Sequence, residues 1–171
     1  MMRRFSLVSL LFVSALAFTA ADADVPQMLT AAVGDAKFVS DDGNIYLIPV
    51  PGSFTLTAAT TGADAYPPPK TPIDRLSITC NAYADGKPTT YAAKEWGPNL
   101  CQVNFIKGDK PMGGEPDATY TIDKSASDNL LEINSANGKV IEGRFHFTLK
   151  SDKGTTLKIS DGTFKAEDRQ R

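Results

Sequence analysis

The stretch Val140-Ile141-Glu142-Gly143-Arg144-Phe145-His146-Phe147-Thr148-Leu149-Lys150 decides the fold. Apolar and polar residues alternate along it, and the apolar row consists of Ile141, Gly143, Phe145, Phe147 and Leu149. Alternation with a period of two is typical of a β-strand that buries one of its faces. We therefore expect a long, half-buried strand over Lys139 to Lys150.

The segment before this strand predicts a hairpin. Leu130 to Asn134 is a second candidate strand, and Asn137-Gly138 is a common turn pair. A two-residue loop would place apolar residues opposite charged ones, so we expect a three-residue loop over residues 136–138. That loop pairs Ile133 with Ile141 and Leu131 with Gly143, and it puts Gly138 at a left-handed bulge position.

The rest of the chain has the same character. Short apolar segments that alternate with turn-rich ones are Met28–Val33, Ala36–Ser40, Ile45–Val50, Ser53–Ala58, Arg75–Ala82, Cys101–Ile106, Thr119–Asp123 and Thr155–Ser160. Regular short strands separated by Gly, Pro, Asn and Asp predict an all-β fold. We expect an antiparallel β-sandwich, with a distorted β-barrel as the alternative. Without an internal repeat, residues 24–171 form one domain.

Residues 1–23 have the composition of an export signal. Arg3 and Arg4 precede an apolar run that ends at Phe18, and residues 21–23 (Ala-Asp-Ala) match the small-x-small cleavage pattern. We expect cleavage after Ala23 and a periplasmic or secreted protein; the alternative is an uncleaved N-terminal helix. No later apolar run is long enough for a membrane-spanning helix, and no cysteine near the cleavage site could carry a lipid anchor. The mature protein is therefore expected to be soluble.

The charge balance is mildly acidic. Cleavage removes Arg3, Arg4 and Asp22, which leaves 16 basic and 19 acidic residues and a net charge of −3. Proteins that bind nucleic acid normally carry a strong basic surface. We therefore expect no nucleic-acid partner.

Cys80 and Cys101 are the only cysteines. An even pair in an exported protein is typical of a disulfide, and each cysteine lies in the apolar row of its candidate strand. A metal pair or a catalytic thiol is the alternative, but both need partner residues and the chain has one histidine. We expect a structural disulfide bond.

Three long segments between strands contain aromatic residues or many glycines and prolines, at residues 59–74, 83–99 and 107–117. Tyr66, Tyr91 and Trp96 are the aromatic residues that we place in candidate binding loops, because long loops on a β scaffold usually hold binding sites. They could be exposed contacts for a sugar or protein partner, but for the rings themselves we favour the interpretation that they plug the open ends of the sandwich.

The residue types for catalysis are scarce. His146 lies in the polar row of its strand, where we expect a solvated residue rather than a catalytic base. One histidine makes zinc sites and Cys-His nucleophile pairs improbable. Asp41-Asp42-Gly43-Asn44 is interpreted as a turn rather than a calcium loop, and no phosphate-binding or dinucleotide motif occurs. We expect no cofactor, no metal and no catalytic residues.

The closing part of the chain has a pattern that consists of Gly138, Ile141-Glu142-Gly143-Arg144-Phe145-His146-Phe147 and Ile159-Ser160-Asp161-Gly162-Thr163-Phe164, with an opening segment Leu29 to Phe38. This pattern resembles a group of exported bacterial all-β domains of unknown function. It covers about a quarter of the chain and implies the fold and the compartment only. Members of the group are often lipid-anchored, whereas this chain lacks the anchoring cysteine.

Three functional hypotheses follow. The first is a non-enzymatic module that binds another macromolecule or a glycan of the envelope or the exterior through its long loops. The second is an inhibitor of an envelope hydrolase, such as a lysozyme or a protease, that inserts the segment between Cys80 and Cys101 into an active site. The third is a hydrolase built on two carboxylates, which requires two acids about 5–10 Å apart in one cleft.

Overall fold

The structure is a computed structural model that describes residues 26–83, 87–92, 95–97, 99–136 and 139–169. The described residues form an all-β protein with one short 3-10 helix, η1 (Asp42–Asn44). The strands are β1 (Met28–Val33), β2 (Ala36–Ser40), β3 (Ile45–Val50), β4 (Ser53–Ala59), β5 (Ile73–Asn81), β6 (Thr89–Tyr91), β7 (Cys101–Asp109), β8 (Ala118–Ile122), β9 (Leu130–Ala136), β10 (Val140–Ser151) and β11 (Thr156–Glu167). Each predicted strand is found; β6 is the strand that the sequence did not predict. The expected signal at residues 1–23 and the turn residue Gly138 lie outside the described residues.

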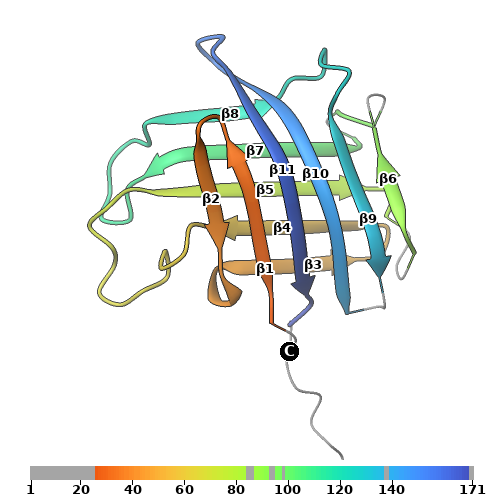
Figure 1. Ribbon diagram of the computed structural model, residues 1–171, viewed down its shortest axis with the longest axis horizontal. Coiled ribbons are helices and arrows are strands. Elements are labelled where there is room, and N and C mark those ends of the chain that lie inside the picture. Colours follow the sequence, from red (N-terminus) through yellow and green to blue (C-terminus); the bar gives the residue numbers. More distant parts are fainter. Residues whose placement is uncertain (1–25, 84–86, 93–94, 98, 137–138, 170–171) are drawn as a thin grey trace, which may run out of the picture.

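The strands form two layers that pack face to face (Figure 1). The front layer has the order β2-β1-β11-β10-β9-β6 and the back layer the order β8-β7-β5-β4-β3, with every strand pairing antiparallel. Figure 1 shows the front strands running across the back strands, as in sandwiches of the orthogonal kind. The expected antiparallel sandwich is therefore confirmed.

Strand β10 joins the two layers. Its first part, Ile141 to His146, pairs with β9 in the front layer, and its last part, Leu149 to Ser151, pairs with β8 in the back layer. A single hydrogen-bonded sheet therefore continues around this corner and is nearly closed into a barrel. The sandwich and the distorted barrel that the sequence left open describe two aspects of the same architecture.

The core lies between the layers and is rich in phenylalanine. Phe54 and Phe105 from the back layer and Phe145 and Phe147 from the front layer are all almost fully buried. The rings of Phe145 and Phe147 stack with centroids 5.1 Å apart, since they are neighbours in the apolar row of β10. The alternation that predicted this strand is therefore the pattern that builds the core.

Strand β11 is longer than predicted, because a bulge carries it past its expected end at Ser160. Ile159 and Gly162 both face the core, so the two residues between them, Ser160 and Asp161, both face outward. Asp161 has a left-handed backbone with φ of 51°. The extra residue shifts the alternation by one position, which is why the apolar row appears to stop at Ser160.

The predicted register of the β9–β10 hairpin is wrong. Ile133 lies opposite Gly143 and Leu131 lies opposite Phe145, instead of the expected Ile141 and Gly143. An irregularity between Glu142 and Gly143 shifts the pairing along the strand. The large Ile133 side chain thereby meets the smallest residue of the row. The predicted faces are correct, because apolar residues still lie opposite residues of the apolar row.

The predicted disulfide is present. Cys80 on β5 and Cys101 on β7 lie directly opposite each other, with a Cα–Cα distance of 4.1 Å, and both are fully buried. The bond encloses the segment that contains β6, Tyr91 and Trp96. Among the described residues, no helix is long and apolar enough to cross a membrane. A disulfide of this kind fits an oxidising, extracytoplasmic compartment.

Gln27 closes the gap between the two layers next to β1. Its buried side chain accepts a hydrogen bond from the backbone N–H of Glu167 at 2.8 Å and donates to the carbonyl of Ile45 at 3.1 Å. Its backbone N–H donates to the carboxylate of Asp42 at 2.8 Å, which Arg169 also contacts. Arg169 and the Gln27 N–H hold the pKa of Asp42 below its usual range. One side chain thus links the end of β11 to the start of β3.

Replacement of Gln27 with alanine is expected to lower the free energy of unfolding by about 2 kcal/mol, because the Glu167 N–H and the Ile45 carbonyl lose their partner in a buried place. Urea unfolding followed by tryptophan fluorescence measures this change. An unfolding curve that matches the wild-type curve would show that this seam is held by other contacts.

Candidate functional site

The structure corrects the expectation for two of the three loop aromatics. Tyr91 and Trp96 are 3% and 6% exposed and belong to the core, so they are not contact residues of a binding loop. Trp96 packs edge-on against Phe147 and donates its indole N–H to the carbonyl of Asn129 at 3.3 Å. These two rings plug the sandwich, as the interpretation that we favour for them predicts.

Tyr91 illustrates why the loop assignment failed. It ends β6, which pairs with β9, and its ring packs near Phe54. Its hydroxyl is buried, has no hydrogen-bond partner among the described residues and has a pKa raised to about 12, mainly by burial and also by Tyr83. The Thr89-Thr90-Tyr91 run is β-branched and aromatic, and it was the available signal for a strand here.

Tyr66 alone remains as an exposed aromatic residue of a predicted loop. It is 97% exposed and lies next to the proline run of residues 67–69, which the structure places between β4 and β5 and outside any strand. A single exposed ring is normal on a protein surface. Tyr66 therefore does not define a site.

The described residues of the segment between the cysteines pack against the rest of the protein. Strand β6 pairs with β9, and Tyr83, Tyr91 and Trp96 are buried. An inhibitor that inserts this segment into an active site needs its side chains free to leave the surface. The three aromatic side chains of the segment are therefore not available for insertion, whereas Lys87, Thr90 and Leu100 are exposed, and the inhibitor hypothesis stays a prediction.

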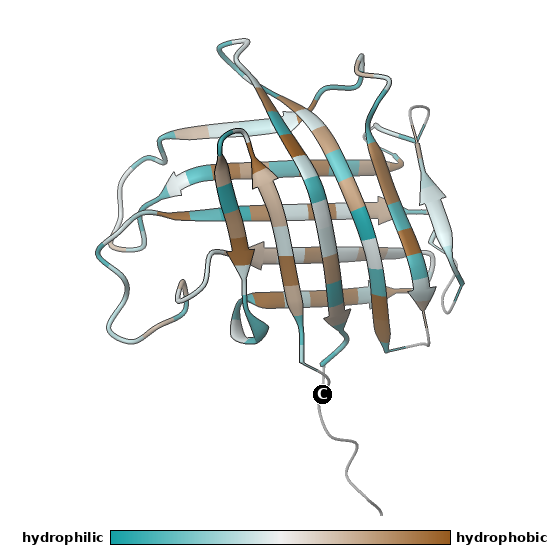
Figure 2. Ribbon diagram, in the orientation of Figure 1, coloured by the Kyte–Doolittle hydropathy of each residue, from teal (hydrophilic) through white to brown (hydrophobic). Residues whose placement is uncertain are grey.

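The outer faces of the two layers differ in chemistry. The front layer carries charged side chains in ion pairs, including Arg144 with Glu132 on β9 and Lys165 with Glu142 at 2.9 Å. His146 lies half-buried on the same face. The strands β3 and β4 of the back layer contain no charged residue at all, and Figure 2 shows them mainly in brown and white beside the teal segments of β10 and β11.

Two rows of outward side chains cross the back layer. Directly paired residues on antiparallel strands point to the same face. The first row runs Tyr46, Thr57, Ser77, Asn104, Thr121 and Lys150, and the second runs Ile48, Thr55, Thr79 and Gln102. Lys150 at the end is the one charged member of these rows. With strands about 4.8 Å apart, the first row spans roughly 24 Å.

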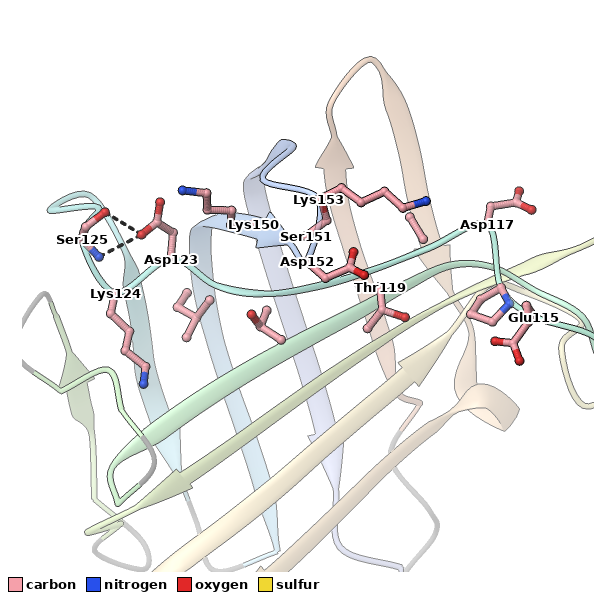
Figure 3. A pocket seen from close by; sticks show the side chains of 14 residues that line it. Glu115, Asp117, Thr119, Asp123, Lys124, Ser125, Lys150, Ser151, Asp152 and Lys153 are labelled. Atoms are coloured by element: carbon pink, nitrogen blue, oxygen red, sulfur yellow. Dashed lines mark hydrogen bonds between the residues drawn. The ribbon is translucent and has the colours of Figure 1, made fainter.

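A wide, open groove of about 860 Å³ lies at the Lys150 end of the first row (Figure 3). Residues 115–119 and 121–125, on and around β8, and residues 150–153, where β10 turns toward β11, line it. Figure 3 shows Asp123 and Lys150 at one end and Glu115 and Asp117 at the other. Lys110 contacts Asp117 at 3.4 Å, so the acids of this groove have cations nearby.

The carboxylates of the groove do not have the environment of a catalytic acid. The hydroxyl and backbone N–H of Ser125 donate to Asp123 at 2.6 and 2.9 Å, and together with Lys150 they hold its pKa below the usual range. A general acid needs a raised pKa, which burial would provide. Glu115, Asp117 and Asp152 are exposed. The hydrolase hypothesis therefore gains no support from this groove.

A smaller pocket of about 270 Å³ lies at the Tyr46 end of the same row. Four members of the first row line it, Tyr46, Thr57, Ser77 and Asn104, together with Asp64, Arg75 and neighbouring residues. The hydroxyl of Tyr46 donates to the carboxylate of Asp64 at 2.6 Å. The Nε of Arg75 contacts Asp109 at 2.7 Å. We call the five uncharged members of the first row, Tyr46, Thr57, Ser77, Asn104 and Thr121, the neutral row; it connects this pocket to the charged groove.

The predicted turn at residues 41–44 helps to build this pocket. Asn44 is buried, its side chain binds Asp41, and its oxygen accepts the backbone N–H of Asp64 at 3.1 Å. Asp42 is occupied by Gln27 and Arg169. The described residues contain no group of three or more His, Cys, Asp or Glu side chains that could hold a metal ion.

The sequence alone did not indicate this surface. The alternating pattern places the hydroxyl and amide residues of β4, β5 and β7 on the solvent-facing side of each strand, but it does not show that they line up across strands. The signal in the sequence was that these residues are uncharged, since the solvent-facing side of a sheet usually carries Lys, Glu, Arg and Asp. Comparison of the chain with protein-family models, with curated proteins and with solved structures finds no match.

Proposed function

We propose that this protein is an exported, non-enzymatic binding module whose ligand lies across the outer face of the back layer. The observation that carries the proposal is the neutral row that joins the Tyr46 pocket to the Lys150 groove. A continuous row of hydroxyl and amide groups offers donors and acceptors along its length. Export is supported by the composition of residues 1–23 and by the disulfide.

This proposal moves the binding surface from the loops to a sheet face. Tyr91 and Trp96 are buried, so they support the site only through the fold. Paired strands hold the row in position, and a site on strands is more rigid than one on loops. A ligand that crosses the strands would contact one side chain from each strand.

Lysine at Asn104 is expected to abolish ligand capture, because it places a long charged side chain in the middle of the neutral row. The oxidised protein is immobilised and exposed to extract from its own envelope, and retained proteins and sugars are identified by mass spectrometry and composition analysis. Thr163→Lys is the matched control, since Thr163 is exposed on β11 in the front layer. Both variants add one positive charge to a strand surface.

The expected result is a ligand retained by the wild type and by Thr163→Lys and lost from Asn104→Lys. Equal retention by both variants, or no specific retention by the wild type, contradicts the proposed site.

A further inference from the structure

We propose that the ligand is a neutral polysaccharide and that one of its sugar rings occupies the pocket beside Tyr46. This inference rests on the proposed function, because it names the ligand class of the same surface. It also assigns the pocket as the point where the chain of sugars is anchored.

The charge of the surface selects the ligand class. Nucleic acids and acidic polysaccharides need a basic surface, and the rows between the two ends contain only hydroxyl, amide and apolar side chains. Within the pocket, the two charged lining residues already have partners, since Asp64 accepts the hydroxyl of Tyr46 and Arg75 is paired with Asp109. A neutral ligand rich in hydroxyl groups is complementary to both features.

The residue types in the pocket match the chemistry of a sugar ring. Such a ring has an apolar face of C–H groups and an edge of hydroxyl groups that donate and accept hydrogen bonds. Tyr46 supplies an aromatic surface, while Asn104, Ser77 and Thr57 supply donors and acceptors. At about 270 Å³ the pocket lies below the usual size of a site for a drug-sized ligand, and it suits a single ring.

Tyr46 is held as a fixed platform. Its hydroxyl donates to Asp64 at 2.6 Å and lies 3.2 Å from the carbonyl of Gly43, while the side chain is still 53% exposed. Asp64 is itself positioned by Asn44, which accepts its backbone N–H. An exposed ring whose hydroxyl group is already hydrogen-bonded loses little conformational freedom when a ligand stacks on it.

The strand spacing fits a polymer better than a single sugar. Neighbouring members of the row lie about 4.8 Å apart, which is close to the length of one sugar unit in an extended chain. From Tyr46 to Thr121 the row therefore presents one polar side chain for each successive unit. Contacts along the row would act together with the contacts in the pocket, so affinity is expected to rise with chain length.

Affinity electrophoresis tests the inference with the oxidised protein and a panel of soluble neutral polysaccharides: a β-glucan, an α-glucan, a mannan, a xylan and a galactan. Polygalacturonate serves as the acidic arm. At least one neutral polysaccharide is expected to retard the protein, and Tyr46→Ala is expected to weaken that interaction about tenfold because the stacking surface is lost. Tyr66→Ala is the matched control, because it removes an even more exposed tyrosine outside the row, and it is expected to change the affinity less than about twofold.

Tyr46→Phe separates the contribution of the aromatic ring from that of the hydrogen bond that positions it. It keeps the ring and loses the hydrogen bond to Asp64, so its affinity is expected between those of the wild type and Tyr46→Ala. Retardation by no neutral polysaccharide, retardation by the acidic one alone, or equal retardation of Tyr46→Ala and the wild type would overturn the inference. If neutral polysaccharides fail while Asn104→Lys still loses a ligand from envelope extract, the proposed function stands and the sugar assignment is wrong. If both experiments fail, both are wrong.

Discussion

Alanine at Gly143 is expected to lower the free energy of unfolding by about 3 kcal/mol, within the range of severe overpacking in a well-packed core. A Cβ atom at Gly143 would lie 2.1 Å from the carbonyl oxygen of Glu132 on β9 and 2.7 Å from the ring of Phe164 on β11. The first of these neighbours is backbone in a paired strand and cannot rotate away. The hairpin would have to separate or change register to accept one methyl group.

Urea unfolding followed by the fluorescence of Trp96, the one tryptophan of the chain, measures the effect. Gly43→Ala is the matched control, because a Cβ atom there meets nothing within 4 Å, and its expected change is below about 0.5 kcal/mol. Equal stability of the two variants would contradict the register in which Ile133 lies opposite Gly143.

Removal of the disulfide is expected to have a similarly large effect. Replacing both Cys80 and Cys101 with alanine frees the unfolded chain from a cross-link between residues 21 positions apart, which costs about 3 kcal/mol in the chain-entropy model. For a domain of this size, that corresponds to a fall in Tm of roughly 6–12 °C. The segment that the bond encloses carries Tyr91 and Trp96, so the plug of the sandwich is expected to loosen first.

Differential scanning calorimetry with and without a reducing agent tests this prediction. The reductant should lower the Tm of the wild type toward that of the double variant and leave the double variant unchanged. A wild-type Tm that does not respond to complete reduction, verified by intact mass, would show that strand pairing alone holds β5 and β7 together.

Much of the fold could be predicted from local pattern. A strand with one buried face shows an alternation of apolar and polar residues. This alternation located β10, β5 and β7, and it placed Cys80 and Cys101 on the inner face. Strand β6 was missed because three residues are too few to display a period. The end of β11 was missed because the bulge at Asp161 shifts the alternation by one residue.

The register of β9 and β10 shows the limit of the same reasoning. Alternation distinguishes the two faces of a strand, but a slip of two residues leaves every side chain on its original face. The choice between such registers depends on packing across the layers. Here the close approach of Phe164 and of the β9 backbone to Gly143 accompanies the observed pairing.

The candidate site likewise has features that the sequence predicts and features that only the fold creates. The sequence was sufficient for the strands other than β6, for the all-β class, for the disulfide partners and for an expected export signal, because each of these depends on residues close together in the chain or on a unique pair. The burial of Tyr91 and Trp96 and the alignment of Tyr46 with Thr57, Ser77, Asn104, Thr121 and Lys150 required the folded structure. Such a row exists only after six strands from distant parts of the chain have paired, since alternation tells which side of a sheet a residue faces and says nothing of its neighbour across the next strand.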